Sequence, residues 1–202
     1  MKLHRFVNKV FTSNSYVLSN DLHEAVIVDV GDVKSIKEFL SVHQLNIVGV
    51  FLTHTHYDHI YGIKALIEDY PGCKVYTSAF GQEALASDRL NFSCYHNDSI
   101  QWEYDCLQIL HEGDRIKIFS DLWGDVIETP GHDESCLSYR MGEYFFSGDS
   151  FIPGMKVIAS FPHSHKGDAE KSRLKILSLA DGCCLCPGHG DVYEHFRSSD
   201  YL

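Results

Sequence analysis

The sequence predicts an α/β protein in which two β-sheets pack against each other and helices cover their outer faces. Short apolar runs typical of strands occur in both halves of the chain, and segments with helical spacing intervene in each half. Elements that alternate in this way bury their apolar faces as layers around a common core. With 202 residues and no linker or low-complexity segment, the chain is expected to form one domain, residues 1–202.

Apolar runs in the first half predict five strands separated by turns and helices. The expected strands cover residues 3–7, 14–19, 24–29, 47–52 and 73–77. Helices are expected over about 33–45, about 60–70 and about 79–86. Asp32 is the expected N-cap of the first helix, and Pro71-Gly72 is expected to end the second. The helix at 60–70 is expected because its apolar residues recur at spacings of three and four.

The second half repeats this pattern with six expected strands and one helix. The strands cover residues 107–110, 116–119, 123–128, 135–140, 144–146 and 183–186, and the helix covers about 168–180. Gly113-Asp114 predicts a turn between the first two of these strands.

Two segments show neither the periodicity of a strand nor that of a helix. Residues 87–103 are expected to form a loop, which either borders the functional site or only connects its neighbours. The run from Phe161 to Lys166 is expected to be a solvated connector, with a loop lining a substrate cleft as the alternative. His163 and His165 within it belong to no motif, so they are not expected to be metal ligands.

The composition is that of a soluble globular protein, with 44% hydrophobic and 22% charged residues. A formal net charge of -11 repels phosphate backbones, so a nucleic-acid substrate is disfavoured. Residues 1–5 lead into an expected strand without an apolar signal core, and no stretch is long enough to span a bilayer. We therefore expect a cytoplasmic protein without a membrane partner.

The seven cysteines are expected to be reduced thiols, several of them buried as small apolar residues. Their number is odd and their spacing matches no disulfide framework. Cys183-Cys184-Leu185-Cys186 is similar in composition to a zinc knuckle. No second pair stands at zinc-finger spacing, however, and Pro187-Gly188-His189 follows at once, so we do not expect cysteine-bound zinc.

A dense group of metal-ligand residues stands at Thr53-His54-Thr55-His56-Tyr57-Asp58-His59, between an apolar expected strand and a helix. His54 and His56 are two apart at a strand end, so their side chains point to the same side. Asp58 and His59 follow in the turn and can point to a neighbouring position. A lone histidine is usually a surface or core residue, but three histidines crowded with an aspartate favour a bound cation. This loop could serve two adjacent metal ions.

Three further candidates share one placement, because each directly follows an expected strand and stands beside a glycine. They are His132, Asp149 and His189. Glycine lets the backbone turn sharply and pass close to a bound ion. Because the ends of several strands converge on one edge of a sheet, these residues and the first loop together make a set of seven candidate ligands.

In four motifs the sequence resembles the metallo-β-lactamase superfamily. The motifs are His54-x-His56-x-Asp58-His59, Thr129-Pro130-Gly131-His132, Ser147-Gly148-Asp149-Ser150 and Pro187-Gly188-His189-Gly190, in the order and spacing of that family. The resemblance implies an αββα sandwich of two mixed sheets, with metals at the sheet edge. It implies a first metal at His54, His56 and His132, a second at Asp58, His59 and His189, and Asp149 as a bridge. The bridging aspartate and the absence of a cysteine ligand favour the hydrolase branch that is similar to glyoxalase II.

This ligand set implies hydrolysis of a small acyl substrate, which would be a thiolester, an ester or a lactone. Two divalent ions lower the pKa of a shared water toward neutrality, and the resulting hydroxide can attack a carbonyl. No serine or cysteine nucleophile is needed, and Asp58 is the candidate catalytic residue that orients the water or takes its proton. Nitrogen and oxygen ligands without thiolate admit zinc, iron and manganese, and zinc is the first choice for both ions.

The sequence departs at three places from relatives that cleave glutathione thiolesters, and each departure bears on the substrate rather than on the metals. Those relatives carry a C-terminal helical domain that binds glutathione, whereas residues 190–202 alone follow His189 here. Their glycine-arginine pair after the bridging aspartate is replaced by the run from Phe151 to Lys156. Asp133-Glu134 follows His132 where small residues are usual.

Other functions remain open on the same residues. An iron-dependent enzyme similar to persulfide dioxygenases would hold one ion with His54, His132 and Asp149. A non-catalytic binding domain stabilised by metal is a further alternative, although the intact ligand set argues against it. A ribonuclease-like phosphodiesterase is disfavoured by the acidic composition and by the lack of an RNA-binding insertion.

Overall fold

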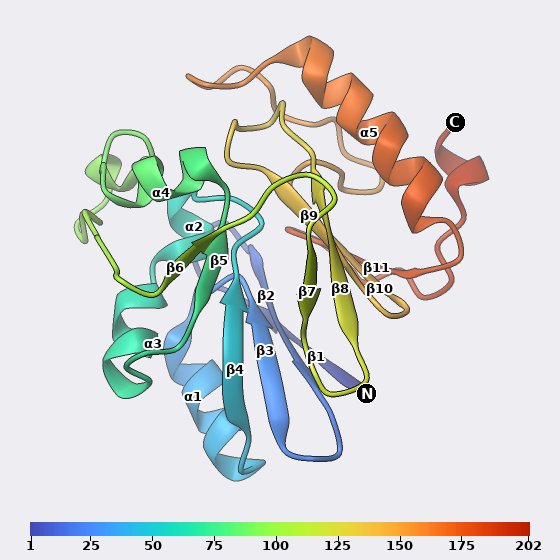
Figure 1. The fold of residues 1–202 in the computed structure, drawn as a ribbon. Helices are drawn as coiled ribbons and strands as arrows, with labels where there is room; N and C mark the ends of the chain where they lie inside the picture. The colour runs from blue at the N-terminus through green and yellow to red at the C-terminus, as the bar shows by residue number, and fades with distance from the viewer.

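The computed structural model describes residues 1–202 and contains two β-sheets packed face to face, with helices on both outer faces (Figure 1). The first sheet has six strands in the order β1-β2-β3-β4-β5-β6, and the second has five in the order β11-β10-β9-β8-β7. This arrangement confirms the predicted fold class. No helix combines the length and the apolar character that crossing a membrane requires. All seven cysteines are free thiols.

The first sheet combines an antiparallel and a parallel part. Its strands are β1 (Lys2–Val7), β2 (Asn14–Ser19), β3 (Glu24–Val28), β4 (Asn46–Phe51), β5 (Val75–Thr77) and β6 (Leu107–Ile109). β1, β2 and β3 pair antiparallel, whereas β3 to β6 run parallel. Parallel neighbours need crossovers. These contain α1 (Val33–Val42), α2 (Tyr57–Ile60), α3 (Ile63–Asp69), α4 (Ala79–Leu85) and the short 3₁₀ helix η1 (Ser93–Tyr95).

The second sheet is mostly antiparallel. Its strands are β7 (Arg115–Lys117), β8 (Trp123–Glu128), β9 (Leu137–Met141), β10 (Tyr144–Gly148) and β11 (Cys184–Pro187). β10 and β11 run parallel, and the crossover between them contains α5 (Lys166–Ala180), which covers the outer face of this sheet (Figure 1). A final 3₁₀ helix, η2 (Ser198–Tyr201), lies beside α5.

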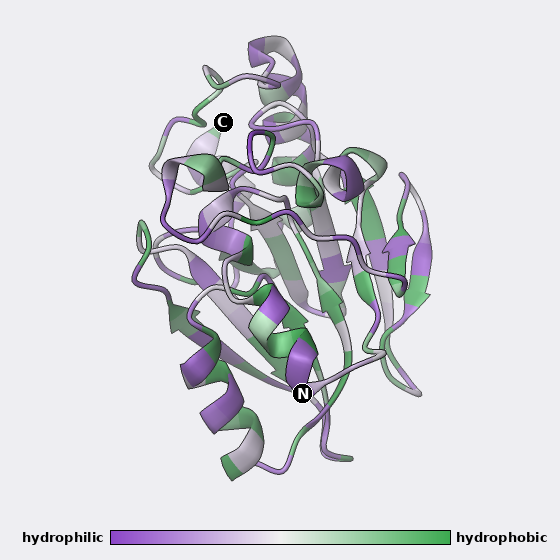
Figure 2. Ribbon diagram, turned by 90° about the vertical axis from the view of Figure 1, so that its left-hand side faces the viewer, coloured by the Kyte–Doolittle hydropathy of each residue, from purple (hydrophilic) through white to green (hydrophobic).

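Apolar side chains fill the three spaces between these four layers. Between the sheets, Phe51 of β4 meets Tyr139 of β9, with ring centroids 5.3 Å apart. Outside the first sheet, α1 and α3 pack on a buried cluster of 16 residues, and outside the second sheet α5 packs on a cluster of nine. Apolar residues accordingly occur along strands of both sheets with polar residues interspersed, and apolar and polar residues also alternate along the helices (Figure 2).

The predicted helix over 60–70 is in fact two helices, α2 and α3. The chain breaks at Tyr61-Gly62 because it passes close to the end of β3, where the Gly62 amide donates a hydrogen bond of 3.0 Å to the Val30 carbonyl. A β-carbon at Gly62 would collide with the Gly31 carbonyl oxygen. The break lets α2 point toward the sheet edge independently of α3.

One further prediction needs correction, and another is confirmed. Asp32 precedes α1 as predicted, but its carboxylate caps no helical amide and accepts instead from the Lys9 amide at 3.0 Å and the Tyr61 hydroxyl at 2.8 Å. The turn at Gly113-Asp114 lies between β6 and β7 as predicted, although these two strands do not pair. They belong to different sheets, and this turn is where the chain passes from one sheet to the other.

One buried hydrogen bond ties the second sheet to the end of β4. The Tyr139 hydroxyl donates to the Leu52 carbonyl at 2.6 Å, two residues before His54. We expect Tyr139→Phe to lower the free energy of unfolding by about 1–3 kcal/mol, because it leaves a buried carbonyl without a partner. Denaturant unfolding measures this change, with Tyr95→Phe at an exposed position as the control. Equal stability of both variants would contradict the proposed bond.

Candidate metal centre

The seven predicted ligands all lie at the edge where the strands of both sheets end. His54 and His56 stand in the loop after β4, and Asp58 and His59 stand in α2. The remaining three, His132, Asp149 and His189, follow β8, β10 and β11. The prediction that the first two lie on a strand end and the next two in a turn was therefore wrong in detail. β4 ends at Phe51, and α2 begins already at Tyr57.

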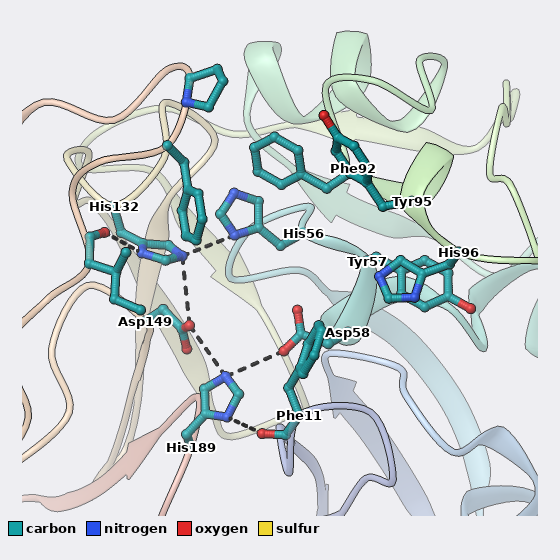
Figure 3. A pocket seen from close by; sticks show the side chains of 13 residues that line it. Phe11, His56, Tyr57, Asp58, Phe92, Tyr95, His96, His132, Asp149 and His189 are labelled. Atoms are coloured by element: carbon teal, nitrogen blue, oxygen red, sulfur yellow. Dashed lines mark hydrogen bonds and ion pairs between the residues drawn. The ribbon is translucent and has the colours of Figure 1, made fainter.

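These side chains form one contiguous cluster. Their ligand atoms make three groups, and within each group all atoms lie within 4.8 Å of one another. The groups are His54, His56 and His132; His54, His59 and Asp149; and Asp58, His59 and His189. Asp149 lies between the outer groups, with Oδ2 at 3.6 Å from His132 Nε2 and 3.3 Å from His189 Nε2 (Figure 3). The arrangement offers two neighbouring positions for cations.

Several atoms of the cluster are buried without a hydrogen-bond partner. They include His54 Nε2, His59 Nε2 and Asp149 Oδ1. Leaving such an atom buried and unpaired costs about 1–3 kcal/mol. Imidazole nitrogens and carboxylate oxygens without cysteine are ligands that zinc, iron and manganese accept. The residues therefore fit divalent metal ions.

Gly188 also belongs to this fit. A β-carbon at this position would collide with the Asp149 carboxylate and would lie 3.0 Å from His59 Cε1. Only a residue without a side chain lets the loop after β11 pass this close to the cluster, as the motif around His189 predicted.

Four of the imidazoles are held by hydrogen bonds from their Nδ1 atoms, so that Nε2 points into the cluster. His132 Nδ1 lies 2.8 Å from the Ile158 carbonyl, and His189 Nδ1 lies 3.1 Å from the Phe11 carbonyl. A carbonyl can only accept, so both Nδ1 atoms carry the proton. His59 Nδ1 and His54 Nδ1 contact Asp29 and the Thr53 hydroxyl in the same way. This fixes the tautomer in which Nε2 is free to bind a cation.

His56 is oriented in the opposite sense. Its Nδ1 lies 3.0 Å from His132 Nε2, inside the cluster, while its Nε2 lies 3.4 Å from the buried Asp133 carboxylate. Asp133 in turn accepts a hydrogen bond of 2.8 Å from the Ser135 amide. Asp133, which departs from the family pattern, thus lies beside a candidate ligand.

Asp29 is the residue of this centre that the sequence analysis missed. It lies just after β3, is buried, and accepts hydrogen bonds of 2.7 Å from both the amide and the hydroxyl of Thr53. Its Oδ2 also lies 2.9 Å from His59 Nδ1. The available signal was its placement, because an aspartate directly after an apolar strand and near Gly31 matches the placement of the other candidates.

Among the seven candidate ligands, two carboxylates are balanced by two protonated imidazoles. Burial alone would raise the pKa of Asp149, but the charge of His59 and the hydrogen bond from His189 outweigh burial and hold it well below its usual range. Burial alone would lower the pKa values of His59 and His189, but the nearby carboxylates raise them to about 9 and about 10. Burial keeps the pKa of His54 well below its ordinary value. The protonated imidazoles of His59 and His189 therefore compensate the negative charge of the carboxylates, which bound metal cations would compensate instead.

The cluster opens into a cavity of about 610 Å³. His56, Asp58, His132, Asp149 and His189 reach its surface (Figure 3). Both segments without periodicity border it, through Phe92, Tyr95 and His96 from residues 87–103 and through Phe161 and Pro162. The alternative of a cavity-lining loop thus holds for both segments.

His163 and His165 lie away from the cluster. His163 Nδ1 is 3.5 Å from Glu134 Oε1, and its ring lies 5.1 Å from Phe80. His165 is the N-cap of α5, where its Nδ1 accepts a hydrogen bond of 3.2 Å from the Asp168 amide. This cap explains why α5 begins at Lys166, two residues before the predicted start.

A sequence model of the metallo-beta-lactamase superfamily matches residues 8–189 of this chain. The chain belongs to the metallo-beta-lactamase superfamily. The hydroxyacylglutathione hydrolase of Salmonella typhi is 28% identical over 176 residues, which are 86% of this chain and 60% of that enzyme. The same enzyme from Salmonella enteritidis PT4 is 27% identical over 176 residues, again 86% of this chain and 60% of that enzyme. The chain thus spans about 60% of the length of these curated relatives.

Solved structures share the fold over almost the whole chain. The BLEG-1 B3 metallo-beta-lactamase superposes with a TM-score of 0.90 at 26% identity, covering 99% of this chain and 97% of that one. ETHE1 from Myxococcus xanthus superposes with a TM-score of 0.74 at 22% identity, over 95% of this chain and 76% of that one. TTHA1623 in a di-iron-bound form superposes with a TM-score of 0.79 at 22% identity, over 95% of this chain and 94% of that one. These matches confirm the fold that the motifs implied.

Asp29 provides a test of how the centre is held. We expect Asp29→Asn to weaken metal affinity about tenfold to a hundredfold, because an amide nitrogen would then face either the Thr53 amide or His59 Nδ1, both donors. Competition with a chromophoric chelator measures the affinity. Asp32→Asn is the matched control, since the Asp32 carboxylate contacts Lys9 and Tyr61 instead. Equal affinities of the two variants would refute the role of Asp29.

The raised histidine pKa values predict a pH dependence of metal binding. His59 and His189, with pKa values of about 9 and about 10, are protonated at pH 7 without metal. An incoming cation must displace these protons, so affinity should rise with pH until it passes these values. Calorimetry in buffers of different ionisation enthalpy should count about two protons released per chain at pH 7. An affinity independent of pH between 6 and 9 would contradict this charge balance.

Proposed function

We propose that this chain is a hydrolase that binds two divalent metal ions and cleaves a small thiolester, ester or lactone with water. The observation that carries the proposal is the single cluster of imidazoles and carboxylates at the floor of a cavity. Ions bound there would lower the pKa of a shared water and supply hydroxide near neutral pH. Zinc is the proposed metal, with iron and manganese also compatible with these ligands.

Each residue of the cluster has a proposed task. The three members of the first group, His54, His56 and His132, would hold one ion. Asp58, His59 and His189 would hold the other, and Asp149 would contact both. Asp58 also lines the cavity, where its carboxylate can orient the water or accept its proton. Burial would raise the pKa of Asp58, but the charge of His59 outweighs burial, so the group is ionised at neutral pH.

Two further proposals concern the class of substrate and the cellular compartment. A net charge of -11 supports a small-molecule substrate over a nucleic acid, because phosphate backbones are repelled. The free thiols of all seven cysteines support the cytoplasm as the compartment.

An iron-dependent dioxygenase is the second candidate. His54 and His132 have ring centroids 5.1 Å apart, and His132 Nε2 lies 3.6 Å from Asp149, so these three could hold a single iron. Such an enzyme would need only one ion, whereas the further group Asp58, His59 and His189 is also complete here. The hydrolase is therefore the function that the geometry supports better.

Metal content tests the proposal directly. The purified chain should carry about two metal ions, and His59→Ala or Asp58→Ala should lose about one of them, together with hydrolysis of a thiolester panel. Elemental analysis and a thiol-release assay measure these outcomes. His163→Ala is the control, because this side chain contacts Glu134 and Phe80 away from the cluster.

Other outcomes would favour the alternatives. About one iron per chain, with oxygen consumption on a persulfide, would favour the dioxygenase. A full complement of metal without turnover on acyl, phosphoester or persulfide compounds would favour the non-catalytic binding domain.

A further inference from the structure

The walls of the cavity, rather than its floor, point to the class of substrate. We propose that the substrate is an uncharged thiolester or ester with an aromatic or branched apolar group, and that glutathione conjugates are poor substrates. This inference rests on the proposed hydrolase function and adds the specificity of the same site.

Aromatic rings form a continuous wall that begins at a candidate ligand. The ring of Phe92 lies 4.8 Å from that of His56, and the ring of Phe161 lies 5.6 Å from Phe92 and 5.9 Å from His56. Phe92 and Phe161 come from the two segments without periodicity, so separate loops build this wall. An apolar group attached to a carbonyl at the cluster would lie against it.

Large apolar side chains stay exposed at the mouth of this cavity. Phe11 is 68% exposed, Tyr95 is 81% exposed and Phe161 is 42% exposed, and all three line the cavity. Apolar groups gathered around a concave site mark a surface that binds an apolar partner. The mouth of the cavity is thus apolar, as its aromatic wall is.

The backbone at two of these rings is held in an unfavourable conformation. Phe11 has φ 51° and Phe92 has φ 62°, which is the left-handed region that bulky residues rarely adopt. Glycine would remove the strain at either position but would also remove the ring. Strain of this kind concentrates at binding sites, where the side chain serves the ligand.

Charge argues against glutathione. The residues that line the cavity include no lysine or arginine, and their ionisable side chains are those of Asp58, Asp149, two tyrosines and the histidines. Lys156 is the one basic side chain that lines an adjoining hollow of about 200 Å³. Glutathione carries two carboxylates, and the cavity lining offers neither of them a lysine or arginine partner, so burying one there carries a desolvation cost. The net charge of -11 adds repulsion.

The size of the cavity suits such a substrate. A volume of about 610 Å³ is within the range of sites that enclose a small organic molecule. In the reaction, the water oxygen bonds to the carbonyl carbon and the carbon–sulfur or carbon–oxygen bond breaks. The products are a carboxylate, a thiol or alcohol, and one proton.

The test compares two acyl groups on two thiols with the zinc-loaded full chain. The substrates are the phenylacetyl and lactoyl thiolesters of neutral N-acetylcysteamine and of glutathione, with acetyl-N-acetylcysteamine as a small reference substrate. We expect kcat/KM to be about tenfold or more higher for phenylacetyl-N-acetylcysteamine than for lactoylglutathione. Phe92→Ala and Phe161→Ala should each raise KM for the phenylacetyl thiolester about tenfold, and should raise KM for acetyl-N-acetylcysteamine by a smaller factor, because the acetyl group has less apolar surface to lose.

Controls separate the wall from the metal centre. Metal content of both variants should equal that of the unmodified chain, and Phe80→Ala, at an aromatic residue that does not line this cavity, should leave KM unchanged. A higher kcat/KM for lactoylglutathione would overturn the proposal and leave the hydrolase intact.

A binding measurement on the zinc-loaded protein with a non-hydrolysable analogue makes the test independent of turnover. Saturation-transfer NMR should show the phenyl ring of the thioether analogue of phenylacetyl-N-acetylcysteamine in contact with the protein, and Phe92→Ala should weaken this signal. Absence of contact would overturn the proposed specificity. Contact without hydrolysis of any thiolester by the metal-loaded chain would support the apolar wall and overturn the hydrolase.

Discussion

Buried nitrogen and oxygen atoms without a hydrogen-bond partner are the constraint on which the rest of this structure depends. His54 Nε2, His59 Nε2 and Asp149 Oδ1 face one another at the edge of both sheets, out of contact with water. Unpaired groups of this kind oppose folding, so surrounding structure must hold them. The layered core supplies that support, because each ligand is fixed within a few residues of a buried strand.

The antiparallel part of the first sheet completes this support from the opposite side of the cluster. The Ser13 hydroxyl donates to the Asp58 carbonyl at 2.7 Å, and the Asn14 side-chain amide donates to the Pro187 carbonyl at 3.0 Å. The Tyr16 hydroxyl donates to the same carbonyl at 2.7 Å. A single segment at the start of β2 thus fixes α2 and the loop after β11, and the two halves of the chain cannot separate without displacing ligands.

The ligand motifs were predictable because each is local to the turn after one strand. The contacts that orient them were not. Asp29 resembles a turn residue in sequence, and its partner His59 lies 30 positions away. Phe92 and Phe161 meet only because two loops without periodicity fold over the same cavity. The sequence also did not show that the chain passes from one sheet to the other at Gly113, because the sequences of β6 and β7 do not indicate whether these strands pair with each other.

Metal ions at the cluster would activate water equally for every acyl substrate, so they cannot account for selectivity among acyl groups. Discrimination must come from surfaces that contact one substrate and leave another unsatisfied. An apolar wall contributes about 1–3 kcal/mol for each fitting methylene, whereas a carboxylate pressed against it loses hydration without a partner. Phe92 and Phe161 contribute the first effect, and the absence of basic residues from the lining produces the second. Both effects favour uncharged apolar acyl compounds, although the metal ligands are those of a family whose matched relatives include hydroxyacylglutathione hydrolases.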